Sequence, residues 1–226
     1  MKKETNNEEI KKNSKITLNK RMILCAIYLG LFVILSILVF TKVTNPLDDA
    51  VTSFVLGIRN DKMTNIMRLF TNISSSYALI VITILITLIA IIKQKRLPYN
   101  TIINLISVFL LSQLFKIIFR RPRPTGEFLT NASGFSYPSG HTMVSFAFFT
   151  FIAYSLCEKI NSKFLKTLIK IGTPILILLI GFSRIYLGVH YLTDIIAGYL
   201  MGMAYLMVFL TIREKNKKKK KMIKWK

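Results

Sequence analysis

Two long stretches without a charged residue constrain this chain more than any other feature. Residues 22–41 form a run of 20 such residues, and residues 69–92 form a run of 24. An α-helix rises about 1.5 Å per residue, so a helix of about 20 residues crosses the ~30 Å hydrocarbon core of a bilayer. Buried helices of soluble proteins are seldom that long and apolar on every face. The sequence therefore predicts an all-α, polytopic membrane protein.

Six spanning helices account for the apolar segments. We expect them at residues 22–41, 70–92, 97–119, 141–157, 164–183 and 191–212. The fifth carries Lys166 and Lys170, whose flexible stems can bring their ammonium groups to the membrane interface. The transmembrane domain then covers residues 22–212, between a basic tail over 1–21 and a Lys-rich tail over 213–226.

The connection between the first two spans is amphipathic. Leu47, Val51 and Phe54 recur at helical spacing, whereas Asp48 falls on another face. This pattern predicts a helix within residues 47–70 that lies in the membrane interface. An ordinary solvated connection is the alternative.

Lysine and arginine are distributed unevenly over these segments. Four of them carry net charges of +4, +3, +3 and +8, together +18 of the total +22: residues 1–21, 93–96, 158–170 and 213–226. In a six-span chain all four lie on one side of the membrane, and cytoplasmic loops carry an excess of Lys and Arg. Both termini are therefore predicted to be cytoplasmic. The Lys-, Asn- and Ile-rich composition favours a bacterial cytoplasmic membrane.

Composition also argues against several partners. The lysine run over 217–221 is explained as a topology determinant on a disordered tail, and Trp225 is the only aromatic residue in that tail, so nucleic-acid binding is not expected. Cys25 and Cys157 belong to no Cys-x-x-Cys or Cys/His cluster, which leaves neither a disulfide framework nor a zinc site. We expect no metal ion or other cofactor.

The polar residues that remain form three compact motifs. They are Lys116-x6-Arg123-Pro124, Pro138-Ser139-Gly140-His141 and Ser183-Arg184-x5-His190-x3-Asp194. In the six-span topology these motifs fall at the extracytoplasmic ends of the third to sixth helices. Polar groups in a membrane protein are costly unless they have a function, so this shared location predicts an active site.

The chemistry of these residues suits the transfer of a phosphoryl group. His190 and Asp194 are four residues apart at a helix start, so the carboxylate can fix the imidazole tautomer and leave the other nitrogen as a nucleophile. His141 is the candidate general acid for a leaving oxygen. The remaining side and main chains can bind a phosphate, namely Lys116, Arg123, Arg184, Ser139 and the amide of Gly140 at a helix N-terminus. Arg120 and Arg121 are interpreted as interfacial anchors.

The three motifs resemble, in order and at every position, the signature of the type 2 phosphatidic acid phosphatases, a superfamily that also contains the vanadium haloperoxidases. The motifs span residues 116–194. The resemblance implies metal-independent hydrolysis of a lipid phosphate through a phosphohistidine. It implies His190 as nucleophile, Asp194 as its orienting group and His141 as proton donor, while Lys116, Arg123, Ser139, Gly140 and Arg184 hold the phosphoryl oxygens.

Several alternatives stay open at this stage. The lipid could be a polyprenyl diphosphate, phosphatidylglycerophosphate or phosphatidate. A lipid phosphotransferase could use the same intermediate with another acceptor, and a small membrane transporter is a more distant alternative. Gly198 and Gly202 form a Gly-x-x-x-Gly pattern that could pack helices within one molecule or between subunits, and we favour packing within the molecule. The oligomeric state is left open.

Overall fold

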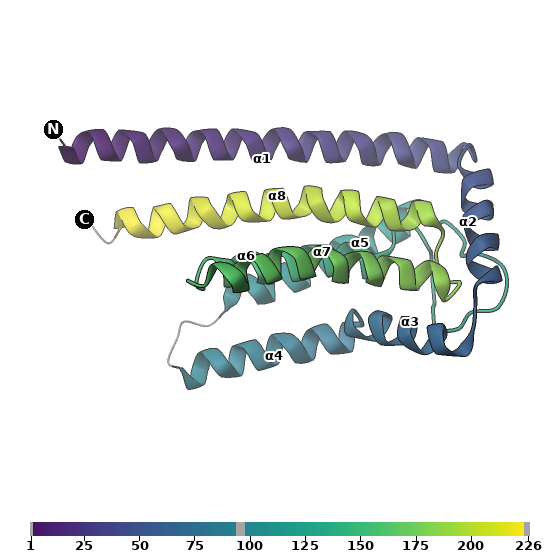
Figure 1. The fold of residues 1–226 in the computed structure, drawn as a ribbon. Coiled ribbons are helices and arrows are strands. Elements are labelled where there is room, and N and C mark those ends of the chain that lie inside the picture. The colour runs from purple at the N-terminus through teal and green to yellow at the C-terminus, as the bar shows by residue number, and fades with distance from the viewer. Residues whose placement is uncertain (1, 94–97, 224–226) are drawn as a thin grey trace.

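The computed structural model of the protein describes residues 2–93 and 98–223, with side chains described over 18–217 inside those ranges. The described residues form helices and no strand, which confirms the all-α prediction. The helices are α1 (Lys2–Phe40), α2 (Asn45–Gly57), α3 (Asp61–Ile73), α4 (Ser76–Ile92), α5 (Tyr99–Phe119), α6 (Gly140–Cys157), α7 (Lys163–Tyr186) and α8 (Leu192–Ile223). Figure 1 shows both termini at one end of an elongated bundle, while α2 runs across the other end.

Five helical segments are long and apolar enough to cross a membrane. They are Leu18–Phe40 within α1, α5, α6, α7, and Leu192–Lys217 within α8. Helices α3 and α4 would together make a sixth span, bent by 51° between them. Six spans are thus obtained if that bent pair counts as one.

The expected continuous second span over 70–92 is wrong. Helix α3 ends at Ile73, and α4 starts only at Ser76. The Oγ atom of Ser75 accepts a hydrogen bond from the backbone N–H of Ala78 at 3.2 Å, which caps a new helix. A run defined by the absence of charged residues does not register this break, because Ser74, Ser75 and Ser76 are polar but uncharged.

The predicted interfacial segment over 47–70 is also divided. Helix α2 ends at Gly57, and Asn60 caps α3 by accepting a hydrogen bond from the N–H of Met63 at 2.9 Å. Helix α2 has the transverse orientation expected of an interfacial helix (Figure 1). Helix α3 instead turns back along the bundle and packs against α7.

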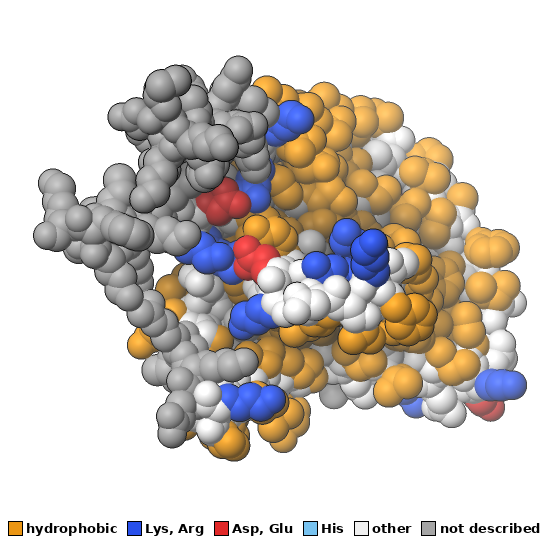
Figure 2. All heavy atoms as spheres, turned by 60° about the vertical axis from the view of Figure 1, so that its left-hand side comes forward, with side chains coloured by type: hydrophobic (Ala, Val, Ile, Leu, Met, Phe, Trp, Pro, Cys, Tyr) orange, Lys and Arg blue, Asp and Glu red, His pale blue; other side chains and the backbone are white. Residues whose placement is uncertain are grey.

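The charged end of the molecule differs from the expectation in one respect. The prediction of a disordered tail over 213–226 is wrong for the residues up to Ile223, because α8 continues through the lysine run. Lysine is a good helix former, so the helix does not end where the apolar residues do. Figure 2 shows Lys and Arg side chains gathered toward the end that carries the termini, beside a largely hydrophobic flank. Lys95 and Arg96 lie outside the described residues.

Helix α8 approaches α6 closely at its two glycines. A Cβ atom on Gly198 would lie 2.8 Å from the carbonyl oxygen of Ser139, and one on Gly202 would lie 3.1 Å from that of Met143. The Gly-x-x-x-Gly pattern therefore packs helices within the molecule, as expected. This contact fixes the start of α6 against the first turns of α8.

We predict that Gly198→Ala destabilises the protein by about 1–3 kcal/mol, because the added methyl group meets rigid backbone and overpacks the α6–α8 contact. Gly30→Ala is the matched control, since nothing lies within 4 Å of a Cβ atom there and alanine has the higher helix propensity. The thermal unfolding midpoint of detergent-solubilised protein measures both. An equal rise in both variants would contradict the packing argument.

Candidate active site

The three sequence motifs meet at the end of the bundle opposite the termini. Lys116 lies in the last turn of α5, Ser139 caps α6, Arg184 lies in the last turn of α7, and Asp194 lies in the first turn of α8. Each functional side chain therefore projects from a helix end or from the loop next to it. The convergence predicted from the topology is what the fold produces.

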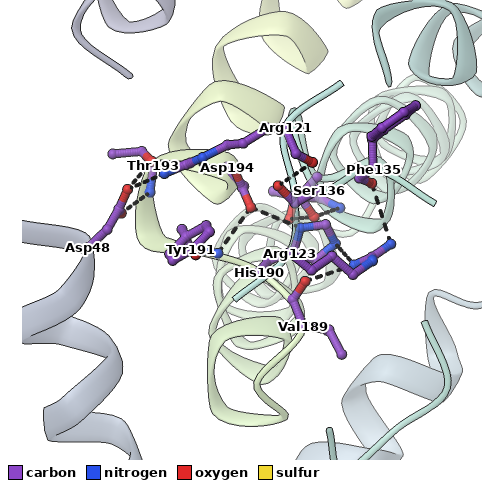
Figure 3. Close-up of polar contacts among 12 residues, drawn as sticks. Asp48, Arg121, Arg123, Phe135, Ser136, Val189, His190, Tyr191, Thr193 and Asp194 are labelled. Atoms are coloured by element: carbon purple, nitrogen blue, oxygen red, sulfur yellow. Dashed lines mark hydrogen bonds and ion pairs between the residues drawn. The ribbon is translucent and has the colours of Figure 1, made fainter. Parts of the chain in front are cut away.

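His190 is held by Asp194. The imidazole Nδ1 atom lies 3.2 Å from the carboxylate Oδ2 atom, and both side chains are buried. The backbone N–H of Tyr191 donates to the same oxygen at 3.0 Å (Figure 3). A hydrogen on Nδ1 is the tautomer that fits an ionised carboxylate, so the lone pair is on Nε2.

The other edge of His190 faces positive charge. Its Nε2 atom lies 3.4 Å from the guanidinium Nη1 atom of Arg123 (Figure 3). Burial, and then the charges of Arg184, Lys116 and Arg123, lower the pKa of His190 well below its ordinary value of 6.5. A pKa in that direction favours the neutral imidazole at neutral pH.

Two of the cations are anchored by backbone carbonyls of the loop before α6. Lys116 Nζ donates to the carbonyl of Phe135 at 2.6 Å. Arg123 donates to the carbonyls of Ser133 at 2.8 Å, Gly134 at 3.1 Å and Val189 at 2.7 Å. These contacts hold both cations beside His190.

Arg184 is bound on only one side. It is buried, and its Nη1 atom donates to the Thr71 hydroxyl oxygen of α3. Its Nε–H is buried and has no partner among the described residues. A buried guanidinium with a free donor is suited to receive an anion.

The start of α6 adds backbone donors to the site. Gly140 and His141 line the cavity beside His190, whereas Ser139 lies behind them as the helix cap. The Ser139 Oγ atom accepts a hydrogen bond from the Thr142 hydroxyl at 3.0 Å. The Ser139 N–H donates to the carbonyl of Asp194 at 3.0 Å, which ties α6 to α8.

A cavity of about 680 Å³ opens from these groups. Its polar end contains both histidines and the three predicted cations. Its other end runs between α4 and α5 and is lined by apolar residues, among them Leu79, Ile80, Leu105, Ile106, Phe109 and Leu110. The cavity thus joins a cationic pocket to an apolar groove.

The interpretation of Arg121 as an interfacial anchor is wrong. Its side chain is buried, and it donates to Asp194 Oδ1 at 2.7 Å and to Asp48 Oδ2 at 2.8 Å (Figure 3). The guanidinium also lies over the Tyr191 ring, 4.2 Å from its centroid. Arg120 is exposed, and its Nε–H donates to the carbonyl of Ile117 at the end of α5 at 3.0 Å, so its role as an interfacial anchor stays a prediction.

Asp48 was not recognised as part of the site either. It projects from α2, is buried, and accepts hydrogen bonds from the Thr193 N–H at 3.0 Å and the Thr193 hydroxyl at 2.6 Å. The sequence pattern indicates only that Asp48 belongs to the polar face of an amphipathic helix. Among the described residues, no group of three or more His, Cys, Asp or Glu side chains is placed to hold a metal ion.

Comparisons with known proteins agree with this geometry. A model of the PAP2 superfamily matches residues 77–218. Phosphatidylglycerophosphatase B of Bacillus subtilis (strain 168) is 30% identical over 196 residues, which cover 83% of this chain and 93% of that protein. The probable lipid phosphate phosphatase 4 of Arabidopsis thaliana is 43% identical over 72 residues, 30% of this chain and 23% of that protein.

Solved structures give the same result. The first transmembrane PAP2 type phosphatidylglycerolphosphate phosphatase from Bacillus subtilis matches with a TM-score of 0.78 at 26% identity, over 84% of this chain and 96% of that one. LpxE of Aquifex aeolicus matches with a TM-score of 0.57 at 25% identity, over 73% and 94%. The region matched by the family model contains the whole tripartite motif, from Lys116 to Asp194. This integral membrane protein belongs to the PAP2 superfamily.

Proposed function

We propose that this PAP2 enzyme hydrolyses a membrane lipid phosphate through a phosphohistidine on His190, without a metal ion and from the extracytoplasmic side. The observation that carries the proposal is one arrangement of charge. His190 has a carboxylate on its Nδ1 edge and three cations toward its Nε2 edge, where the cavity begins. Such a site favours attack on an anionic phosphorus centre.

In the proposed reaction the Nε2 lone pair of His190 attacks phosphorus, and the bond from phosphorus to the lipid oxygen breaks. His141, which lines the cavity, gives that oxygen its proton. A water molecule then attacks the phosphohistidine, which releases inorganic phosphate and restores the imidazole. The attacking water gives one proton to His141, so the enzyme returns to its starting state.

The proposed phosphoryl contacts come from side chains and from a helix end. Lys116, Arg123 and Arg184 would neutralise the equatorial oxygens, with Arg184 offering its unpartnered Nε–H. Gly140 would contribute its N–H at the α6 N-terminus, where free N–H groups favour an anion. Ser139 would support this contact from behind, because its N–H donates to the carbonyl of Asp194 and its Oγ atom caps the helix. Three cations supply the electrostatic stabilisation that a divalent ion gives in other phosphatases.

The apolar half of the cavity supports a lipid as substrate. The groove between α4 and α5 continues directly from the cationic pocket, so a phosphate head group and an acyl or prenyl chain fit one continuous space. The similarity to phosphatidylglycerophosphatase B makes phosphatidylglycerophosphate the first candidate. Phosphatidate and polyprenyl diphosphates share the same chemistry.

The sidedness is part of the proposal. The basic segments lie toward the end of the bundle with the termini, and the site lies at the other end. Excess Lys and Arg mark the cytoplasmic side. The termini would then be cytoplasmic and the site extracytoplasmic, in a bacterial cytoplasmic membrane.

We expect His190→Ala to lower the rate of phosphate release from phosphatidylglycerophosphate in EDTA by at least about 10³-fold, because no other described group can replace the nucleophile.

His141→Ala should lower the rate of phosphate release from the lipid about 10²–10⁴-fold. The same variant should lower p-nitrophenyl phosphate hydrolysis much less, because that leaving group needs no proton. Equal losses on both substrates would contradict the role of His141. Phosphate found on a second lipid instead of in solution would indicate a phosphotransferase.

His190 should stay neutral well below pH 6.5, because burial and the neighbouring cations lower its pKa. The chain has only two histidines, so ¹⁵N-histidine NMR of the His141→Gln variant reports His190 alone. The imidazole ¹⁵N shifts should remain those of the neutral ring from pH 8 through pH 6. A titration centred at or above 6.5 would show that the cations do not act on this ring.

Narrowing the groove should affect long-chain substrates only. Leu110→Trp is expected to raise KM for a long-chain lipid phosphate about tenfold, a loss of about 1.4 kcal/mol of binding, and to leave p-nitrophenyl phosphate hydrolysis unchanged. Leu114→Trp, one helical turn along α5 and outside the cavity lining, is the matched control. The same KM in both variants would argue against the groove as the chain-binding site.

A further inference from the structure

We propose that Asp48 and Arg121 are positioning residues for the nucleophile: together they hold Asp194 ionised and correctly oriented, and Asp194 in turn holds His190. The proposal rests on the phosphohistidine function argued above. It links α2, a helix outside all three sequence motifs, to the reacting nitrogen.

The contacts form one unbroken chain. Asp48 Oδ2 pairs with Arg121 Nη2 at 2.8 Å, Arg121 Nη1 pairs with Asp194 Oδ1 at 2.7 Å, and Asp194 Oδ2 meets His190 Nδ1 at 3.2 Å (Figure 3). All four side chains are at least nine-tenths buried. Each carboxylate oxygen of Asp194 has its own donor, so the group cannot rotate without losing an ion pair.

Arg121 compensates a charge that is otherwise costly. Asp194 is fully buried, and an ionised carboxylate in such surroundings takes up a proton unless a cation balances it. As Nε2 bonds to phosphorus, the imidazole ring gains positive charge, which an ionised Asp194 stabilises and a protonated one does not. Arg121 therefore acts through Asp194 and does not line the substrate cavity.

Asp48 fixes Arg121 from the opposite side. Its two oxygens bind Arg121 and both donors of Thr193, the residue just before Asp194 in the first turn of α8. The same carboxylate thus sets the orientation of the guanidinium and the position of the helix start. Without it, one edge of Arg121 would face no acceptor in a buried site.

The charged and titratable groups around Asp194 come from every neighbouring element. They are His190 and Tyr191 from the α7–α8 loop, Tyr137 from the loop before α6, Arg121 and Arg123 from the segment after α5, Lys116 from α5, Arg184 from α7 on the far side of His190, and Asp48 from α2. Arg121 is the one among them that forms an ion pair with an Asp194 oxygen that His190 does not use.

The test compares each residue with a neighbour of the same type in the chain: Arg121 with Arg120, and Asp48 with Asp49. Arg121→Met and Asp48→Asn should lower kcat for lipid phosphate about 10–100-fold, the loss typical of second-layer partners of an active-site group, with KM changed less than about threefold. Arg120→Met and Asp49→Asn should match the wild type, because both side chains are exposed. Rates are expressed per folded protein, determined by size-exclusion chromatography.

The pH profile separates positioning from a purely structural role. Arg121→Met should move the acid limb of kcat to higher pH, since Asp194 then protonates more readily. Asp48→Asn should not move the acid limb to higher pH, because Asp194 is then the one carboxylate left to pair with Arg121. Arg121→Lys should restore the wild-type acid limb and part of kcat, since the cation is kept and the planar bridge between Asp48 and Asp194 is lost.

Three results would overturn the proposal: an Arg121→Met acid limb at the wild-type pH, an equal loss in Arg120→Met, or a loss confined to KM. If Arg121→Met does not fold, the kcat and acid limb of Arg121→Lys and Asp48→Asn decide. His190→Ala is assayed in parallel. Activity in that variant would reject the proposed function itself, whereas an inactive His190→Ala beside wild-type-like Asp48 and Arg121 variants would reject only this inference.

Discussion

The site depends on one buried carboxylate. Asp194 has no exposed surface, and an isolated charge in that environment would protonate. The ionised form of Asp194 is stabilised by the donors around it. The guanidinium of Arg121 binds one oxygen, and the imidazole of His190 and the N–H of Tyr191 bind the other. The groups that supply or support these donors come from three places in the chain: α2, the segment after α5 and the start of α8.

The helix backbones supply the rest of the geometry. Because Gly198 has no side chain, α6 comes close enough to α8 for the Ser139 N–H to reach the carbonyl of Asp194. One contact therefore sets the distance between His190, the proposed nucleophile before α8, and the N-terminus of α6, where the proposed function places the anion. Small residues commonly permit such approaches in membrane helices, where packing and hydrogen bonds drive association.

The sequence was sufficient for the parts that depend on long-range averages. Hydropathy located the spanning segments, and sidedness predicted that Lys116, His141 and His190 would meet at one end. The sequence was not sufficient where a single hydrogen bond determines where a helix begins, as at the Ser75 cap that separates α4 from α3. Arg120 and Arg121 are chemically identical neighbours. Helix α5 ends at Phe119 and Arg120 takes a left-handed conformation (φ 49°), so a local backbone turn sends one outward and the other inward.

Lys116 and Arg123 are held beside His190 by neutral acceptors of the backbone. Carbonyl oxygens of residues 133–135 and of Val189 occupy the donors of Lys116 and Arg123. In the proposed function, phosphoryl oxygens take over some of these donors, exchanging neutral acceptors for charged ones, and charge-assisted hydrogen bonds are the stronger. Binding would then require little movement of the cations themselves. In the proposed function, the loop before α6 would therefore preorganise the anion site, while Asp194 and its partners would preorganise His190 from the opposite side of the imidazole.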